Sequence, residues 1–409
     1  MRRVPSERKP REQGPGALVP WLEPGGALTA RRAVSTLAAD MGEKTRASSE
    51  SLKNFSVQPR TETSAQNAFL ALLDDIRGDV DARLRGFLDS AIDQAAAHGS
   101  DVEAMVAAVR DLCLRGGKRL RPALLVAGFR ATGTRARLGP ALDAGVALEL
   151  LHTYLLIHDD WMDEDTIRRG GPAVHLLLSR RFRSSKLGDA AGILAGDCAA
   201  GLALEALSRV DVPPSRMPRV IDCFARMQID AVFGQQLDLV GKTRDAESVY
   251  ALKTSSYSVQ GPLKLGALLA DCSNDLLRVL DRFGMPLGIA FQLRDDLLGV
   301  FGRPDEIGKP VGGDLRQGKR TALIGLALRK LRGGGRRAVT SVFGNPEATA
   351  AELRRAVEVL ENSGIRGLVE RRIAELSAEA RKALEAARLP TRTAQVLGDA
   401  VNALLDRGH

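Results

Sequence analysis

The feature that most constrains the fold of this 409-residue chain is a helical spacing of apolar residues, which begins near residue 69 and continues almost to the end. In the first such stretch, apolar residues recur at intervals of three and four positions: Phe69, Leu72, Leu73, Ile76, Val80, Leu84 and Leu88. This pattern is typical of an amphipathic helix with one face on a core. No run of alternating β-branched residues competes with it, so the sequence predicts an all-α fold.

Similar stretches follow along the chain, and Gly or Pro stands at most of the joins. We expect these further helices at about 101–114, 119–131, 138–161, 173–181, 187–208, 215–239, 246–270, 273–300, 318–331, 347–362, 365–387 and 391–406. Aromatic residues make up only 4% of the chain, which argues against a β-sandwich or barrel. The prediction is one large helical domain over 67–409.

Residues 1–66 have a different character. They mix Arg, Pro, Gly, Ser and Thr and show no sustained apolar periodicity. Such a composition is typical of a disordered extension. An organelle transit peptide is the alternative, but the acidic residues in this segment argue against it.

Charge and cysteine content bound the class of protein. The net charge of +9 indicates an anionic partner of some kind, which leaves nucleic acid, an anionic membrane, a phosphorylated small molecule or simply a basic surface open. The four cysteines stand far apart without a C-x-x-C pair, so a disulfide scaffold or a zinc ribbon is disfavoured. The most apolar window, 190–207, carries Asp197 and Glu205 and is typical of a buried helix. We expect a soluble, cytoplasmic protein without a transmembrane segment.

A cluster of carboxylates ends the apolar helix predicted at 138–161. Asp159, Asp160 and Asp163 follow the apolar stretch, and Asp159 and Asp163 share one helix face. Like charges at this spacing repel, and negative charge near a helix C-terminus opposes the helix dipole. A divalent cation held between the carboxylates removes both costs, and Mg²⁺ prefers oxygen ligands shared with substrate phosphates. The alternative is a solvated acidic turn.

A second acidic pair makes the cation site the better interpretation. Asp295 and Asp296 again end an apolar helical stretch, directly after Gln292 and Arg294. Two such pairs indicate one cation cluster held from two sides of a cavity. The adjacent Asp74 and Asp75 serve as a contrast, because they lie on the polar side of the first helix and are expected to be a surface pair.

Basic residues accompany the carboxylates, several of them next to glycines, which let a ligand approach the backbone closely. They are Lys118, Arg119 and Arg121 after Gly116-Gly117, Arg168 and Arg169 before Gly170-Gly171, Lys253, Lys309, and Lys319 and Arg320. Each group taken alone is compatible with a solvated face. Together they are sufficient to neutralise two diphosphates, and Lys and Arg are the usual phosphate ligands. This combination fits chemistry in which Mg²⁺ withdraws charge from a diphosphate leaving group.

The order of these motifs resembles the trans-isoprenyl diphosphate synthase (polyprenyl synthetase) family, and within it the geranylgeranyl diphosphate synthases. The resemblance covers about 67–407, and it implies an all-α bundle of the isoprenoid synthase type with a central active-site cavity. It also implies condensation of isopentenyl diphosphate with an allylic diphosphate, a homodimer, and no nucleic-acid partner. One departure concerns Gly299, which stands where the full family pattern has a third Asp in the second aspartate motif.

The resemblance also implies a role for each motif residue. The magnesium ligands are Asp159, Asp163 and Asp295, supported by Asp160 and Asp296. The allylic diphosphate is bound by Arg168, Lys253, Lys309 and Lys319, and Gln292 orients it. Isopentenyl diphosphate is held by Lys118, Arg121, His152 and Arg169. Thr254 faces the developing allylic cation.

Product length is implied by the residues just before the first aspartate motif. Tyr154 and Leu155 lie roughly 6–8 Å below the metal site along the helix. Tyr154 is an aromatic residue at the fifth position before the motif, and Leu155 at the fourth position is not aromatic. In the family that the chain resembles, this pattern is similar to that of geranylgeranyl synthases. Farnesyl and longer-chain synthases remain alternatives.

Three other kinds of protein are disfavoured. A class I terpene cyclase shares the first acidic motif, but at Asn274-Asp275 the chain has Arg278 where a hydroxyl residue is needed. A catalytically silent subunit is disfavoured by the complete set of metal and diphosphate residues. A nucleic-acid-binding helical protein is disfavoured because no basic surface is interleaved with aromatic residues.

Overall fold

The computed structural model of the chain describes residues 67–241, 245–302 and 312–406. The extension predicted at 1–66 and the predicted diphosphate ligand Lys309 lie outside these described residues. By its contacts the chain divides into two units, Met1–Thr63 and Ser64–His409, and the description below concerns the second.

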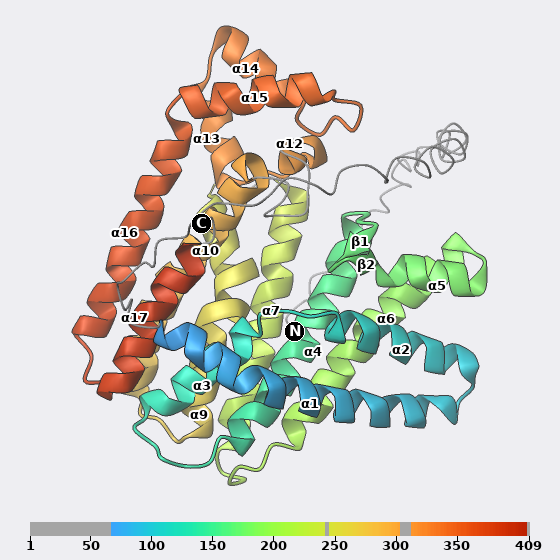
Figure 1. Cartoon of the computed structure of the whole chain (residues 1–409), viewed down its shortest axis with the longest axis vertical. Coiled ribbons are helices and arrows are strands. Elements are labelled where there is room, and N and C mark those ends of the chain that lie inside the picture. The colour runs from blue at the N-terminus through green and yellow to red at the C-terminus, as the bar shows by residue number, and fades with distance from the viewer. Residues whose placement is uncertain (1–66, 242–244, 303–311, 407–409) are drawn as a thin grey trace, which may run out of the picture. The chain divides into compact units, whose positions relative to one another are not determined.

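The described residues are almost entirely helical (Figure 1). In chain order the elements are α1 (Ala68–Ala96), α2 (Ser100–Leu114), α3 (Leu120–Ala131), α4 (Gly139–Met162), β1 (Ile167–Arg168), β2 (Gly171–Pro172), α5 (Val174–Phe182), α6 (Ser185–Ser208), α7 (Met217–Val240), α8 (Ala246–Tyr250), the π-helix η2 (Ala251–Gln260), α9 (Gly261–Leu269), α10 (Asn274–Phe301), α12 (Gly313–Gln317), α13 (Ala322–Lys330), α14 (Gly333–Thr340), α15 (Ala350–Asn362), α16 (Ile365–Glu385) and α17 (Thr391–Leu405). The predicted all-α class is confirmed.

The differences from the predicted helices are local. The two-stranded antiparallel hairpin β1–β2 was not predicted, nor were the short helices α12 and α14. Helix α14 begins with three glycines, Gly333 to Gly335, a composition that disfavours a helix in the sequence alone. The helix predicted at 318–331 begins later, at Ala322, because Thr321 caps it by accepting a hydrogen bond from the backbone N–H of Ile324.

The core is built around helices that are apolar on more than one face. Helix α4 is buried along most of its length, and α3 packs against α9. The α3–α9 contact is very close: a Cβ atom at Gly128 would lie 2.0 Å from the carbonyl oxygen of Leu263, and one at Gly266 would lie 1.9 Å from that of Leu125. Glycine at both positions is therefore required for the two backbones to meet.

The chain from α8 to α9 forms one continuous helical segment that is locally widened to a π-helix, η2. Lys253 and Thr254 lie in this π segment. The π segment is also bound to α10, because the hydroxyl of Ser255 donates to the carbonyl oxygens of Gly284 and Met285. Single π segments inside helices are frequent at functional sites.

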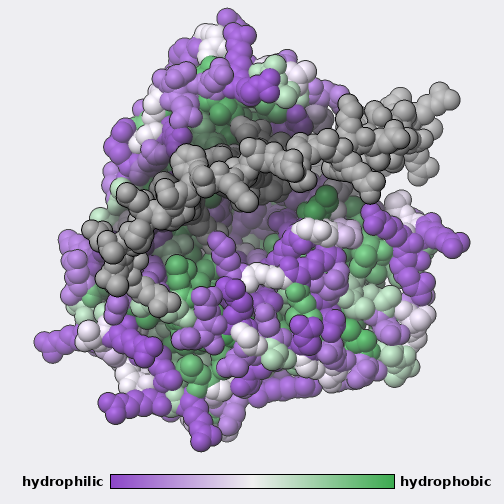
Figure 2. All heavy atoms as spheres, in the orientation of Figure 1, coloured by the Kyte–Doolittle hydropathy of each residue, from purple (hydrophilic) through white to green (hydrophobic). Residues whose placement is uncertain are grey.

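Two helices are long and apolar enough to cross a membrane by length and composition. Helix α4 has 72% of its most apolar window buried, as expected of a core helix. The corresponding window of α6 is only 39% buried, so this helix presents apolar side chains at the surface. Figure 2 shows one face of the molecule, on which hydrophilic side chains predominate and hydrophobic ones form smaller patches between them.

Candidate active site

One cavity of about 1110 Å³ brings together most of the predicted site residues. Its lining comes from segments that are far apart in the sequence, including the start of α3, the end of α4, the hairpin, η2, α10 and α12. The predicted site residues in the lining are Lys118, Arg121, His152, Asp159, Arg168, Arg169, Lys253, Thr254, Gln292, Asp295, Asp296 and Lys319.

The first aspartate motif lies at the C-terminal end of α4, where Asp163 is the cap residue. Asp159 faces the cavity and accepts a hydrogen bond from Nε2 of Gln235 at 3.1 Å. Two cations lie near the same carboxylate: Lys253 Nζ is 3.7 Å from Oδ1, and Arg168 Nη2 is 3.8 Å from Oδ2. The repulsion expected within the motif is thus offset by positive charge from other elements.

Asp160 differs from its neighbour because it is buried and does not line the cavity. Nε of Arg168 donates to its Oδ1 at 2.6 Å, whereas its Oδ2 has no hydrogen-bond partner among the described residues. Burial raises the pKa of Asp160 to about 6, against the opposing effect of Arg168. This carboxylate is in position to orient Arg168 towards Asp159.

Two lysines connect elements around the first motif. Lys253 donates to Oδ2 of Asp238 on α7 at 2.6 Å, and Lys319 lies 3.3 Å from Oδ2 of Asp163. Burial alone lowers the pKa of each lysine, but the surrounding aspartates outweigh it and the net pKa is raised. Both lysines therefore stay cationic in the site. The sequence analysis assigned no role to Asp238.

The second aspartate motif has a different environment. Asp296 is buried and is bound by neutral donors: Nε2 of Gln292 at 3.1 Å, and the hydroxyl of Tyr250. Burial, together with the charges of Asp314 and Asp295, raises the pKa of Asp296 to about 7 although both hydrogen bonds oppose this. Asp295, its neighbour, lines the cavity.

Tyr250 is a site residue that the sequence analysis missed. Besides donating to Asp296, its hydroxyl oxygen accepts the backbone N–H of Ala322 at 2.7 Å. It therefore ties α10 to the start of α13. An isolated tyrosine in a helical stretch carries no motif signal, so only its position in the fold reveals this role.

Thr254 and Gln292 form a direct pair across the cavity wall. The Thr254 hydroxyl donates to Oε1 of Gln292 at 2.7 Å, and the amide of Gln292 continues to Asp296. This chain of hydrogen bonds fixes the orientation of the Gln292 side chain. That Gln292 in turn orients the diphosphate stays a prediction.

The two arginines after Gly116-Gly117 have different surroundings. Arg119 is buried, pairs with Glu149 and with Asp81 (Nε to Oδ1, 2.7 Å), and donates to the carbonyl oxygen of Cys113. These bonds anchor the segment that carries Arg119.

Arg121 extends across the cavity wall. Its Nη2 donates to Oγ of Ser258 at 2.8 Å, and its guanidinium lies 4.7 Å from the ring centre of Tyr257.

His152 lies beside this group, with its ring centre 6.1 Å from that of Tyr257. Burial, followed by the charges of Arg121 and Arg169, lowers the pKa of His152 well below its ordinary value. The ring is therefore neutral. Its Nδ1 is buried without a hydrogen-bond partner among the described residues, and so is Nε of Arg121. Unsatisfied buried polar atoms of this kind are typical of a site that binds a polar ligand.

The two residues predicted to limit product length do not line the cavity, whereas His152, Leu156 and Asp159 of the same helix do. Tyr154 packs edge-on against His158 at 4.9 Å between ring centres and is hydrogen-bonded to Gln228 of α7. Leu155 is partly buried. Their effect on product length stays a prediction.

The donor set fits a hard divalent cation. The side chains are carboxylates from two helices on one cavity, and Asp160 offers a buried oxygen without a partner. Within the part of the chain described, no three His, Cys, Asp or Glu side chains already converge as a closed metal site. An arrangement in which protein oxygens supply only part of the coordination is what Mg²⁺ adopts with substrate phosphates.

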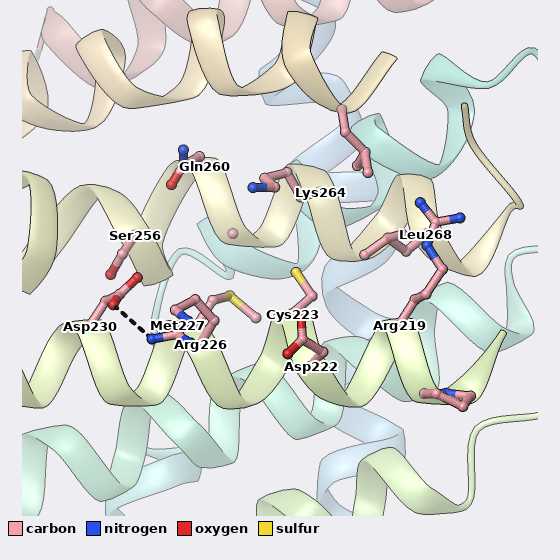
Figure 3. Close-up of a pocket in the computed structure, with 13 residues that line it drawn as sticks. Arg219, Asp222, Cys223, Arg226, Met227, Asp230, Ser256, Gln260, Lys264 and Leu268 are labelled. Carbon is pink, nitrogen blue, oxygen red and sulfur yellow. Dashed lines mark ion pairs between the residues drawn. The ribbon is translucent and has the colours of Figure 1, made fainter. Parts of the chain in front are cut away.

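A second pocket, of about 440 Å³, lies between α7, the η2–α9 segment and α10 (Figure 3). Two of its cations are paired: Arg226 with Asp230 of the lining, and Lys264, whose Nζ lies 2.8 Å from Oδ1 of Asp281 outside it. Burial raises the pKa of Cys223 to about 12, so its thiol is unreactive. None of the predicted site residues lines this pocket, which leaves the larger cavity as the candidate site.

Proteins similar to this chain are found both by sequence and by structure. A polyprenyl synthetase family model matches residues 102–360. A geranylgeranyl diphosphate synthase of Methanosarcina mazei is 38% identical over 267 residues, which is 64% of this chain and 77% of that protein. A farnesyl diphosphate synthase of Geobacillus stearothermophilus is 38% identical over 229 residues, covering 53% and 73%.

Among solved structures, a geranylgeranyl pyrophosphate synthase of Corynebacterium glutamicum, complexed with isoprenyl diphosphate and magnesium, is similar with a TM-score of 0.77 at 34% identity. The match covers 82% of this chain and 99% of that one. The similar structure and the similar sequences therefore belong to the same kind of enzyme.

Proposed function

Because the chain belongs to the polyprenyl synthetase family of prenyltransferases, we propose that it condenses isopentenyl diphosphate with an allylic diphosphate and makes geranylgeranyl diphosphate as its main product. The observation that carries the proposal is the single cavity that joins both aspartate motifs to the lysines and arginines of distant elements. Dimethylallyl, geranyl and farnesyl diphosphates are the candidate allylic substrates.

The first wall of the cavity is proposed to bind the allylic diphosphate. Asp159, Asp163 and Asp295 are the residues that would hold Mg²⁺, with Asp160 and Asp296 behind them. When bound, Mg²⁺ withdraws charge from the diphosphate leaving group. Arg168, Lys253 and Lys319 add positive charge to that end of the cavity, and Lys309 is predicted to do the same.

The second wall is proposed to bind isopentenyl diphosphate. Lys118, Arg121 and Arg169 supply charge there, and the neutral His152 supplies a hydrogen-bonding ring next to them. The cations of each wall hold one of the two anionic diphosphates. The hydrocarbon ends of the two substrates are thereby positioned towards each other, which lowers the entropic cost of the bimolecular step.

The chemistry itself needs no side-chain nucleophile. The allylic carbon–oxygen bond breaks, and the electron pair leaves with the diphosphate. The double bond of isopentenyl diphosphate then attacks the allylic cation, and a proton is lost to the departing diphosphate. Thr254, whose hydroxyl donates to Gln292, is assigned the role of stabilising the developing positive charge through its oxygen.

The geranylgeranyl product is supported by the names of the relatives and by Tyr154 at the fifth position before Asp159. A farnesyl synthase at 38% identity keeps the shorter product as the second candidate. Tyr154→Ala is expected to lengthen the product if this ring limits the growing chain. Its hydrogen bond to Gln228 makes Gln228→Ala the matched variant that loosens the ring without removing it.

The deciding experiment incubates the purified chain with Mg²⁺, isopentenyl diphosphate and each allylic diphosphate in turn, and separates the products by chromatography. Geranylgeranyl diphosphate as the main product supports the proposal, and its loss in excess EDTA supports the metal requirement. Farnesyl diphosphate as the main product would correct the proposed product length and leave the proposed reaction unchanged. A cyclic terpene, or no product with any substrate, refutes the proposed reaction.

We further propose that the chain forms a homodimer through α6 and α7. Large apolar side chains are exposed at helical spacing on both helices: Leu187, Leu194 and Leu204 on α6, and Ile221, Ile229, Val232 and Phe233 on α7. Leu194 and Phe233 are 58% and 55% exposed, an unfavourable state for isolated apolar residues that association removes.

Light scattering tests the dimer. Leu194→Asp is expected to shift the chain to a monomer, whereas Val102→Asp, at an exposed apolar position on α2, is the matched control and leaves the mass unchanged. A monomeric wild-type chain contradicts this part. We also propose that the protein is cytoplasmic, which fractionation of cells tests. The family supports this, and the proposed dimer would cover the apolar window of α6 without a membrane.

A further inference from the structure

A dense group of cations lies outside the active-site cavity, where α13 ends and α14 begins. This basic turn consists of five exposed side chains: Arg329, Lys330, Arg332, Arg336 and Arg337. No acidic residue occurs between Asp314 and Glu347, so the surrounding segment supplies no opposite charge. None of the five cations lines the cavity, and the proposed reaction does not use them.

Among the described residues, no side chain of the basic turn forms an ion pair. The situation on α16 is different, because Arg366 there pairs with both Glu361 and Glu370. A cluster of like charges without partners repels itself, and an anionic surface brought to it removes that repulsion. The basic turn is therefore suited to an anionic partner from outside the chain.

The fold holds the basic turn in place. Nη1 of Arg332 donates to the carbonyl oxygens of Arg329 and Leu331 at 2.6 and 2.9 Å. On α14, Val339 is buried, and a Cβ atom built on Gly335 would lie 3.4 Å from a side-chain atom of α15. One side of α14 thus packs on α15 while its arginines stay exposed, so the cations belong to a structured surface.

Helix α13 connects the basic turn to the active site. Lys319 and Thr321 line the cavity, and α13 begins at the next residue, Ala322. The nine residues of α13, at 1.5 Å each, carry the chain roughly 13 Å away from the cavity. Helices α14 and α15 lie at one end of the described structure, beyond α12 and α13 (Figure 1). The basic turn is thus near the site without being part of it.

We propose that the basic turn docks the protein on a membrane surface that contains anionic phospholipids. Clusters of Lys and Arg of this size are typical of binding to such surfaces. The choice of a membrane rests on the proposed function, because a prenyl diphosphate carries a long hydrocarbon chain that enters a bilayer favourably. Docking places synthesis next to the phase that takes up the product. Nucleic acid fits less well, since residues 329–342 include no aromatic side chain to stack on bases.

The experiment measures co-sedimentation of the full-length chain with lipid vesicles, in the absence of substrates. One set of vesicles is made of phosphatidylcholine alone, and the other contains phosphatidylglycerol as well. The wild-type chain is expected to bind only the vesicles with phosphatidylglycerol. This binding is expected to fall as the salt concentration rises above about 0.15 M, because salt screens the attraction.

Arg336→Gln/Arg337→Gln is the test variant, because both side chains are exposed and removing them breaks no ion pair. Binding to the anionic vesicles is expected to weaken about fivefold for each cation removed. Arg135→Gln/Arg137→Gln is the matched control: it removes the same charge from two exposed positions in the connection between α3 and α4. The control is expected to bind within about twofold of the wild-type chain, because the attraction falls off over a short distance.

The outcomes separate docking from catalysis. Equal weakening in the two variants, both folded by circular dichroism, would show that total charge and not the basic turn determines binding, and would refute the proposal. If the wild-type chain ignores anionic vesicles but forms product without them, docking is refuted and the proposed function stands. If it binds vesicles as expected but forms no product, the proposed function fails alone. Binding to a single-stranded oligonucleotide in place of vesicles, lost in Arg336→Gln/Arg337→Gln, would assign the turn to nucleic acid and overturn the membrane.

Discussion

The two aspartate motifs look alike in the sequence and differ in the structure. Asp159 and Asp163 of the first motif are partly exposed and lie near arginine and lysine side chains. Asp296 of the second is buried and is held by a tyrosine and a glutamine, which carry no charge. The first motif is thus stabilised by cations from elsewhere in the chain. The second is stabilised by neutral donors, which makes it more dependent on protonation or on a bound metal.

The largest expected effect comes from the first motif. Asp159→Asn keeps the shape of the side chain but removes a charge that faces the cavity, and we expect kcat to fall by at least about 100-fold, as for loss of one group that stabilises transition-state charge. Steady-state assays at saturating Mg²⁺ measure this. An unchanged melting temperature would show that the loss is not caused by unfolding, and retention of full activity would remove Asp159 from the site.

A smaller effect is expected for Tyr250, whose uncharged hydroxyl binds Asp296 of the second motif. Tyr250→Phe removes the donor to Asp296 and the acceptor for Ala322 N–H, and we expect the Mg²⁺ concentration for half-maximal activity to rise by about 10-fold. Leaving these buried groups unpaired is also expected to lower stability by about 1–3 kcal/mol. Tyr257→Phe is the comparison variant, because that hydroxyl does not contact an aspartate motif; an equal metal effect in both would contradict the assignment.

The pH dependence of stability distinguishes the motifs directly. Burial raises the pKa of Asp296 to about 7, so the folded protein holds this proton where the unfolded chain has lost it. Its contribution to stability is therefore greatest below the unfolded pKa and is lost as pH rises, by about 1 kcal/mol for each pH unit between about 4 and 7. Thermal unfolding in EDTA at several pH values measures this slope, and Asp296→Asn should flatten it. Unaltered slopes would place the proton elsewhere.

The smallest effect is expected at an adjacent aspartate pair outside the site. Asp74 and Asp75 are exposed on α1, and Asp74 forms a surface ion pair with Arg77. Changing both to Asn should leave activity within about twofold and stability within about 0.5 kcal/mol. The same assays test this, and a large loss would mean that acidic doublets in this chain matter wherever they lie.

Much of the fold followed from local patterns. Helical periodicity identified most of the long helices, because one buried face per helix is written in residues three and four apart. The exceptions are short elements: α12 and α14, and the β1–β2 hairpin, are held by surrounding structure and have too few residues for a pattern of their own.

The candidate site was predictable in its residue types and less so in their surroundings. Most of the predicted residues line one cavity, and Arg119 of the same basic motif lies in its wall too, although its guanidinium is buried in ion pairs with Glu149 and Asp81. Which cation of a motif is already paired with carboxylates of the protein depends on residues from other helices, and the motif itself does not show it.

The sequence by itself determined the helical class, the positions of the aspartate and basic motifs, and the absence of a third acid at Gly299. Only the tertiary structure decided that Asp160 is buried behind Arg168, that Tyr250 binds Asp296 from 46 positions away, and that Asp314 fills the space beside Gly299. The physical reason is that helix formation and charge clustering depend on near neighbours in the chain. Burial, pKa and the choice of hydrogen-bond partner depend on residues that only folding brings together.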